Sequence, residues 1–196
     1  MSRLTRRTIL TTGAFAAGTL LTRDPTFAQT PLAATPECHD HPAATVRQTE
    51  GPFFKPSSPE QTDLFEPGMA GQPLELVGFV LTRGCKAVPG ALLDFWQADN
   101  AGTYDNSGFR LRGHQFADTE GRFRLRTIVP AVYDGRTRHI HVKVQAKGGR
   151  ILTTQLYFPG EPQNAKDGLF RKDLLMRTAK NAGDLAGRFD FVLDLA

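Results

Sequence analysis

Residues 139–145 read His-Ile-His-Val-Lys-Val-Gln, and this alternation is typical of a β-strand with one polar and one apolar face. On such a strand His139 and His141 lie on one face. The apolar residues at 140, 142 and 144 lie on the other face, where they would pack into a core. The strand therefore separates a chemical face from a packing face.

Similar apolar runs recur along the chain, separated by turn sequences. They span residues 74–81, 91–97, 123–127, 151–158 and 189–195. The turns are supplied by Arg83-Gly84, Val88-Pro-Gly90 and Asp118-Thr-Glu-Gly121. Strands at this spacing predict an all-β fold, an antiparallel β-sandwich with long loops. Helix is expected to be minor, and residues 170–178 are its best candidate.

The first 28 residues predict an export signal. Arg6-Arg7 precede a weakly apolar run, Thr11–Leu21, which is followed by a stretch typical of a cleavage site that ends at Ala28. An ordinary secretory signal is the alternative, but the glycines and threonines in the run favour a twin-arginine-type signal peptide cleaved near Ala28. The run falls short of the roughly 18 apolar residues that a spanning helix needs, so no stable membrane anchor is expected. We predict a periplasmic or secreted protein.

Residues 29–46 are rich in Ala, Pro and Thr and predict an extended N-terminal arm, followed by one domain over residues 47–196. The export segment holds four arginines and one aspartate, which account for three of the four net positive charges of the chain. We therefore expect no nucleic-acid partner. The basic stripe Arg122, Arg124 and Arg126 is interpreted as the solvated face of a strand.

Two cysteines, Cys38 and Cys85, follow the predicted export signal. A disulfide between them fits an oxidising compartment and would tie the arm to the sheet. Two unpaired side chains are the alternative, because sequence does not show whether their Cα atoms approach within roughly 7 Å.

The pair His139-Ile-His141 is ambiguous by itself. Such pairs occur in zinc, copper and cupin-type sites, and also on exposed strands without any metal. A cupin site would need a glutamate shortly after the second histidine, yet residues 142–150 contain no acidic side chain. A zinc hydrolase would need a third histidine or acidic ligand.

Two of the three tyrosines favour a more specific metal. Tyr104 and Tyr133 lie in polar, turn-like stretches, whereas Tyr157 lies in an apolar run. Phenolates are hard, anionic donors that suit a hard trivalent ion, so two phenols with two imidazoles favour Fe(III) over Zn(II). The other histidines, His39, His41 and His114, are expected to be solvated and outside this ligand set.

Several separated motifs, in order, resemble the intradiol ring-cleavage dioxygenases and within them the protocatechuate 3,4-dioxygenase-like group. They are Thr49-Glu-Gly-Pro-Phe53, Val88-Pro-Gly-Ala-Leu-Leu-Asp-Phe-Trp-Gln-Ala98 before Tyr104, Asp118-Thr-Glu-Gly-Arg-Phe123, Thr127-Ile-Val-Pro130 before Tyr133, and Arg136-Thr-Arg-His-Ile-His141. The resemblance covers most of residues 47–196 and implies a β-sandwich enzyme.

The resemblance implies that Tyr104, Tyr133, His139 and His141 bind a non-haem Fe(III). It further implies that a catechol chelates this iron, with one tyrosinate, assigned to Tyr133, accepting a proton. With O2 the ring would then break between the two hydroxylated carbons and give a cis,cis-muconate-type diacid.

Other residues match family positions around the iron. Arg136 would stabilise negative charge that develops on the substrate, with a surface salt bridge as the alternative role. Gln155 would orient groups near the iron, or it would simply point to solvent. Gly51 and Pro52 resemble the loop that covers the ring, and Trp96 would either line the pocket or anchor the core.

Where many relatives have a bulky aromatic residue or a proline after the second tyrosine, this chain has Asp134 and Gly135. We therefore expect a roomier pocket and leave the catechol unspecified. A non-catalytic, exported β-sandwich module that binds an aromatic or a polysaccharide is the alternative function. A homo-oligomer is compatible with the sequence.

Overall fold

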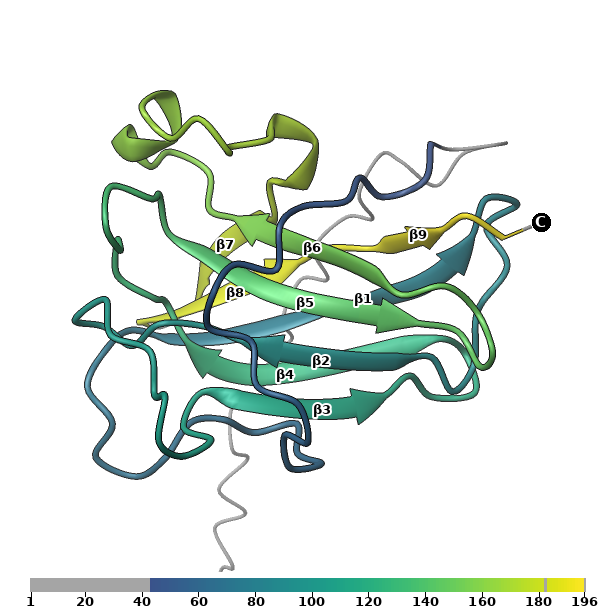
Figure 1. The fold of residues 1–196 in the computed structure, drawn as a ribbon, viewed down its shortest axis with the longest axis horizontal. Coiled ribbons are helices and arrows are strands. Elements are labelled where there is room, and N and C mark those ends of the chain that lie inside the picture. Colours follow the sequence, from purple (N-terminus) through teal and green to yellow (C-terminus); the bar gives the residue numbers. More distant parts are fainter. Residues whose placement is uncertain (1–42, 182, 196) are drawn as a thin grey trace, which may run out of the picture.

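A computed structural model describes residues 43–181 and 183–195, and in this range two β-sheets pack face to face (Figure 1). The first sheet has five strands: β1 (Pro73–Thr82), β4 (Arg122–Ile128), β7 (Arg177–Asn181), β8 (Asp184–Arg188) and β9 (Phe191–Leu193). The second has four: β2 (Leu92–Trp96), β3 (Arg112–Phe116), β5 (His139–Gln145) and β6 (Leu152–Tyr157). The predicted sandwich is confirmed. The predicted signal peptide and residues 29–42 of the arm lie outside the described residues.

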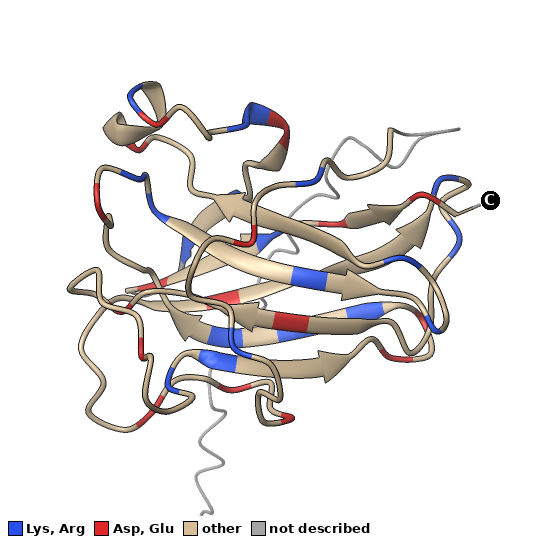
Figure 2. Cartoon of the chain, in the orientation of Figure 1, with Lys and Arg blue, Asp and Glu red and all other residues tan. Residues whose placement is uncertain are grey.

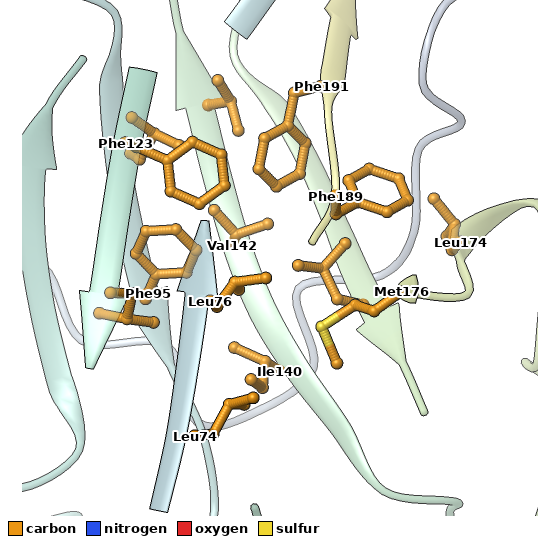
Figure 3. Close-up of a cluster of buried hydrophobic side chains, with 14 of the residues drawn as sticks. Leu74, Leu76, Phe95, Phe123, Ile140, Val142, Leu174, Met176, Phe189 and Phe191 are labelled. Atoms are coloured by element: carbon orange, nitrogen blue, oxygen red, sulfur yellow. The ribbon is translucent and has the colours of Figure 1, made fainter. Parts of the chain in front are cut away.

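The core lies between the two sheets, as the alternation in β5 predicted. Ile140, Val142 and Val144 are fully buried there, against residues such as Leu76 from β1 and Phe95 from β2 (Figure 3). Full burial of one such side chain stabilises the fold by about 2 kcal/mol. The apolar face of β5 is therefore fixed towards the core, which turns His139 and His141 to the outside of the second sheet.

The first sheet contains both parallel and antiparallel pairs, whereas the sequence predicted antiparallel strands. Its order is β4-β1-β8-β7, with β9 pairing β1 farther along. β1 runs antiparallel to β4 but parallel to β8 and β9. The reason is that β7 and β8 form a hairpin, from which β8 and β9 emerge in the same direction as β1. The second sheet, order β3-β2-β5-β6, is antiparallel throughout.

The helix candidate over residues 170–178 is confirmed for one short 3-10 turn only. This stretch forms a short 3-10 helix, η2 (Lys172–Leu174), and then enters β7; another, η1 (Pro162–Ala165), precedes it. Leu174 at the end of η2 and Met176 just before β7 are both buried. Tertiary burial of these two side chains therefore overrides the local helical preference.

The closing strand is shorter than the predicted 189–195, because the chain changes its pairing near Phe189. A Cβ atom added to Gly78 would lie 1.7 Å from the carbonyl oxygen of Phe189, so β1 needs glycine at this crossing. The side chain of Asp190 accepts a 3.0 Å hydrogen bond from the Phe79 amide. The polar strand β3 and the hairpin of β7 and β8 were missed by the sequence interpretation.

The arginine stripe on β4 is solvated, as predicted. Arg122, Arg124 and Arg126 alternate with buried residues and pair with carboxylates of Asp118, Glu75 and Asp63. Basic and acidic residues are interspersed over both sheets and their loops (Figure 2). Within residues 43–181 and 183–195, no helix has the length and apolarity that crossing a membrane requires.

An extended segment, residues 43–62, covers the outer face of the second sheet (Figure 1). The Gln48 amide bonds to the Thr153 carbonyl at 2.9 Å, and farther on the His114 amide bonds to the Pro59 carbonyl at 2.9 Å. Lys143 forms an ion pair with Glu50 at 2.5 Å. This covering segment buries the face of β5 that bears the two histidines.

Cys85 is disulfide-bonded. Cys38, the other cysteine of the chain, lies outside the described residues, as do His39 and His41. His114 is not fully solvated as expected, because β3 places it half-buried with its Nδ1 atom 2.8 Å from the Ser58 carbonyl oxygen.

Candidate metal centre

The register of the second sheet aligns several polar and aromatic side chains in one row. Trp96 pairs with Arg112 on one side and with His141 on the other, and His141 pairs in turn with Gln155. His139 lies two residues from His141, opposite Tyr157. Residues that are directly opposite on neighbouring strands share a face. The strands thus bring together residues that are far apart in sequence, at the end of the sheet where β2 ends and β5 begins.

The two histidines turn their Nε2 atoms towards each other at 3.1 Å, and both rings are buried. The Nδ1 atom of His139 bonds to the Thr137 carbonyl oxygen at 2.6 Å, which leaves its Nε2 lone pair free. Burial lowers the pKa of His139 to about 4 and that of His141 well below its usual range. Both imidazoles are therefore neutral at neutral pH, as metal ligands must be.

Tyr104 approaches this pair from the loop between β2 and β3. Its hydroxyl lies 3.3 Å from the His139 Nε2 atom, and the side chain is buried. The Asp99 carboxylate shapes the loop by accepting bonds from the Ala101 and Thr103 amides. Burial raises the pKa of the Tyr104 phenol well above its usual value, although the Arg136 and Arg112 guanidiniums oppose that effect. A cation at the phenol oxygen would be needed to ionise it at neutral pH.

Tyr133 lies in a tight turn between β4 and β5. Tyr133 and Arg136 exchange backbone hydrogen bonds of 3.3 and 2.6 Å around Asp134 and Gly135. These central residues have φ angles of 43° and 76°, as a type I′ turn requires, and Asp-Gly is a preferred sequence for that turn. Asp134 and Gly135, from which the sequence predicted a roomier pocket, therefore form the turn that fixes Tyr133 beside Arg136.

The loops of the two tyrosines contact each other. A Cβ atom added to Gly102, whose φ is 81°, would lie 2.5 Å from the Val132 carbonyl oxygen, so the close approach requires glycine. The Ala131 amide also bonds to the Asp99 carbonyl at 2.9 Å. As a result, the rings of Tyr104 and Tyr133 meet edge to face, with centroids 5.5 Å apart.

The donor set fits a metal ion. Ligand atoms about 2.1 Å from one ion lie about 3 Å from one another when their bonds are at right angles. The His139 Nε2 atom already has this spacing, at 3.1 Å from the His141 Nε2 atom and 3.3 Å from the Tyr104 hydroxyl, and the Tyr133 ring packs against the Tyr104 ring. Within the described chain no group of three or more His, Cys, Asp or Glu side chains could hold a metal. The phenols of Tyr104 and Tyr133 would complete such a site, and these donors match those expected for a hard ion.

Arg136 points to the same site and is held by a buried carboxylate. Its Nε atom bonds to both oxygens of Asp167, at 3.0 and 2.9 Å. Asp167 also accepts bonds from the Thr137 and Leu169 amides. Burial alone would raise the pKa of Asp167, but these bonds and the guanidinium outweigh it and hold the pKa below its usual value. Arg136 is therefore no surface salt bridge, because its partner side chain is only 1% exposed.

Gln155 is fully buried and connects Arg136 to the covering segment. Its Oε1 atom accepts bonds from Arg136 Nη2 at 2.7 Å and from the Tyr157 hydroxyl at 2.9 Å. Its Nε2 atom donates to the Thr49 carbonyl at 2.9 Å. Burial raises the pKa of Tyr157 to about 12, so this phenol stays protonated as a donor. The solvent-facing alternative for Gln155 is excluded.

The three expected substrate contacts lie around His141. A Cβ atom on Gly51 would be 3.5 Å from the His141 ring, which places the loop directly over the imidazole. Pro52 is exposed at the outside of that loop. Trp96 is 1% exposed and stacks on His141 with centroids 4.8 Å apart. Trp96 therefore supports the His141 ring from behind, and a direct substrate contact stays a prediction.

Three residues at the site were not singled out from the sequence. Phe53 stacks on Tyr104 with centroids 4.4 Å apart. Asp167 fixes Arg136, and Arg112 is a buried guanidinium at the start of β3. Phe53 stood inside a motif used for the resemblance and could have been found there. Asp167 and Arg112 lie in polar stretches without a local signal, and only the fold brings them to the site.

Comparison with known proteins identifies a family model and similar proteins. The family model described as "Dioxygenase" matches residues 49–195. A hydroxyquinol 1,2-dioxygenase from Rhodococcus opacus is 34% identical over 76% of this chain. The chain spans 57% of the length of that relative.

Solved structures are similar as well. The dioxygenase domain of a dioxygenase carbohydrate-binding protein fusion from the cellulolytic bacterium Streptomyces sp. SirexAA-E is 56% identical, with a TM-score of 0.77. The match covers 79% of this chain and 100% of that domain. The 3-chlorocatechol 1,2-dioxygenase from Rhodococcus opacus 1CP is 27% identical, with a TM-score of 0.71, over 78% of this chain and 73% of that protein.

Proposed function

The chain belongs to the intradiol ring-cleavage dioxygenases, and from that premise we propose that it cleaves a catecholic ring between its two hydroxylated carbons with O2. The product would be a cis,cis-muconate-type diacid. The observation that carries the proposal is the convergence of two neutral imidazole nitrogens, 3.1 Å apart, with the phenols of Tyr104 and Tyr133. A sandwich that only binds ligands has no use for this donor set.

The family implies iron, and the residues present fit it. Tyr104, Tyr133, His139 and His141 would hold Fe(III), whose bound state supplies the Lewis acidity that makes a chelated catechol reactive towards O2. His139 is oriented for this task by its bond to the Thr137 carbonyl. His141 is kept in place by the stacked ring of Trp96.

Tyr133 is the ligand residue best placed to exchange a proton with the substrate. It is half-buried, whereas Tyr104 and both histidines are buried. Its turn also joins it directly to Arg136. We propose that the Tyr133 phenolate oxygen accepts a proton from the catechol, which binds through both hydroxyl oxygens.

Arg136 would stabilise negative charge that develops on the substrate. Its Nε atom is occupied by Asp167 and its Nη2 atom by Gln155. The plane of the guanidinium is therefore fixed before substrate arrives, as preorganised electrostatic stabilisation requires. Gln155 also bonds to the Thr49 carbonyl, so the Arg136 network and the Gly51 loop are positioned together.

Oxygen consumption by the iron-loaded protein tests the reaction. The panel contains catechol, hydroxyquinol, chlorocatechol and protocatechuate, with mass spectrometry of the products. We expect uptake with at least one of them and a product whose mass is that of the substrate plus O2, as a diacid. Aldehyde products would show extradiol cleavage, and binding without uptake would favour the non-catalytic alternative.

Colour tests the metal centre separately. Phenolate coordinated to Fe(III) absorbs visible light, so iron-loaded protein should be red-brown. Tyr133→Phe removes a proposed ligand and should change this absorption. Tyr157→Phe, a nearby phenol outside the ligand set, is the matched control and should retain it. A colourless iron-loaded protein, or an unchanged Tyr133→Phe spectrum, would contradict the ferric tyrosinate site.

We also propose export by the twin-arginine route, followed by cleavage near Ala28. The pattern of residues 1–28 and the disulfide at Cys85 support an oxidising, extracytoplasmic location. N-terminal sequencing of the mature protein from a cell fraction tests this, with Arg6-Arg7→Lys-Lys as the variant expected to stay unprocessed. Assembly into a homo-oligomer stays a prediction, which the mass in solution will decide.

A further inference from the structure

Gln97 is a buried polar side chain at the point where the chain leaves β2. Leu93 and Phe95 point from this strand into the core, and Gln97 continues their two-residue period. Gln97 is only 1% exposed. The structure therefore puts an amide at a position where the core otherwise takes an apolar side chain. The reaction proposed above does not use this residue.

Both ends of the Gln97 amide bind β4, which belongs to the other sheet. Its Oε1 atom accepts a 3.0 Å hydrogen bond from the Thr127 hydroxyl, and its Nε2 atom donates to the Ile128 carbonyl at 2.9 Å. A longer bond, 3.3 Å, joins Nε2 to the Ala98 carbonyl. Thr127 is itself fully buried. A polar bridge therefore crosses the core from one sheet to the other.

The bridge adds direction, rather than apolar burial, to the contact between the two sheets. Apolar packing is non-directional, whereas a hydrogen bond constrains both a distance and an angle. Replacing both partners of a buried hydrogen bond with apolar groups of the same shape costs little stability. A fully bonded polar pair in an apolar core therefore specifies one arrangement of the elements that it joins.

The bridge lies at the base of the two loops that carry the phenols. The chain runs from Gln97 into the loop of Tyr104, and from Thr127 into the loop of Tyr133. The loops meet again farther out, where the Ala131 amide bonds to a carbonyl of the Tyr104 loop at 2.9 Å. The relative position of the two loops thus depends on contacts both at their base and along their length.

We propose that Gln97 is a positioning residue, which sets the separation of the Tyr104 and Tyr133 phenols by holding the ends of β2 and β4 together. The rings of these tyrosines meet at a centroid distance of 5.5 Å. The side chain of Gln97 bonds to residues at the base of the loops, so it acts through them and not on the substrate. The inference rests on the proposed function, because two phenols need a defined separation when they bind one metal ion.

The test uses substitutions that remove hydrogen bonds and keep most of the side-chain shape. Gln97→Met keeps the length of the side chain and removes both bonds to β4. Thr127→Val removes the hydroxyl, whereas Thr127→Ser keeps it. All variants are made in the full chain.

Gln115→Met is the matched control. Gln115 is also buried, and its Oε1 atom accepts a 3.3 Å bond from the Arg124 amide, so it too joins the second sheet to β4. Its neighbour on β2 is Leu93, which lies away from the end of β2 that leads into the Tyr104 loop. This variant therefore measures the general effect of losing a buried glutamine between the sheets.

The first readout is hydrogen exchange of the Ala131 amide in the metal-free protein, because this amide joins the two loops. The Met176 amide, which bonds to the Tyr157 carbonyl at 2.9 Å, is the internal reference for overall stability. The second readout is the rate of iron loss to a chelator from the iron-loaded protein. The exchange readout needs neither iron nor turnover.

In Gln97→Met, exchange at Ala131 should be about tenfold faster relative to Met176, because the base of the two loops is no longer joined. Iron loss should also be about tenfold faster, as for removal of a group that orients metal ligands. Thr127→Val should show a smaller change in the same direction, because the bond to the Ile128 carbonyl persists. Thr127→Ser and the control Gln115→Met should match wild type in both readouts.

Unchanged relative exchange at Ala131 in Gln97→Met would overturn the inference, because Gln97 would then serve overall stability only. Equal changes in Gln97→Met and Gln115→Met would overturn it too, since any buried glutamine between the sheets would have the same effect. Faster exchange with wild-type iron loss would also count against it, because the loops would then move without affecting the ligands.

If Gln97→Met does not fold, Thr127→Val decides, and wild-type exchange at Ala131 in that variant counts against the inference. A colourless iron-loaded wild-type protein would instead overturn the proposed function. In that case exchange in the metal-free variants still decides whether Gln97 positions the two loops.

Discussion

Two guanidiniums lie close to the same centre, and they are held in opposite ways. Arg136 binds both oxygens of the buried Asp167 carboxylate. Arg112 binds two backbone carbonyls, and none of the ion pairs of the described chain includes it. A buried carboxylate compensates the first charge by direct contact, whereas the second is bound by carbonyl dipoles and attracted by the Asp105 and Asp94 carboxylates without forming an ion pair. The same residue type thus provides an ion-paired donor at one position and a charge held by backbone carbonyls at the other.

The largest expected effect comes from breaking the ion pair between Arg136 and Asp167. Asp167→Asn leaves Arg136 without its counter-charge and should lower the free energy of unfolding by about 3 kcal/mol, as for loss of one member of a buried ion pair. Urea denaturation measures it. Asp63→Asn, which breaks the exposed pair with Arg126, should cost under about 1 kcal/mol. Equal losses in the two variants would show that burial of the Asp167 pair does not matter.

Next in size is the effect of Arg136 on turnover. Arg136→Gln should lower kcat by about a hundredfold, equivalent to about 2.7 kcal/mol, because a preorganised charge is removed from the reacting substrate. Visible absorption should persist, since Arg136 is not a ligand. Oxygen uptake and absorption spectra of the same sample measure both. Loss of colour together with turnover would assign Arg136 to metal retention instead.

A smaller effect is expected from pH. The pKa of Asp167 is held below its usual value in the folded protein, so this group stabilises the fold above the unfolded pKa of about 3.9. That contribution is lost as pH falls through the folded pKa. Urea denaturation between pH 7 and pH 3 should therefore show falling stability for wild type and a flatter profile for Asp167→Asn. If stability fell with pH equally in wild type and in Asp167→Asn, Asp167 would not contribute to the acid sensitivity of the fold.

The smallest effect is expected on the Arg112 side. Phe53→Leu keeps the carbonyl that accepts from Arg112 and removes the stacking on Tyr104. It should cost about 1 kcal/mol of unfolding free energy. Thermal unfolding of the metal-free protein measures it, with Phe109→Leu, an exposed ring, as the control. If Phe53→Leu lowered the free energy of unfolding as much as Asp167→Asn, aromatic packing near Arg112 would matter as much as the ion pair of Arg136.

Some of the site could be predicted because it follows local rules. The two-residue period of β5 placed His139 and His141 opposite the core residues Ile140 and Val142, and the structure agrees. Two tyrosines in turn-like stretches indicated a hard metal; Tyr104 lies beside His139, and Tyr133 packs against Tyr104. The short strand β3 escaped prediction because polar residues and a glycine hid its alternation.

Local sequence patterns predicted the sandwich class, the polar face of β5 and the donor types of the candidate centre, because side-chain period and donor chemistry are properties of short stretches. Tertiary folding set the parallel pairing of β1 with β8 and β9. It also decided which arginine meets a carboxylate. Asp167 is 31 residues from Arg136, and Phe53 is 59 residues from Arg112. Contacts over such separations depend on how the whole chain returns on itself, and no local period encodes that path.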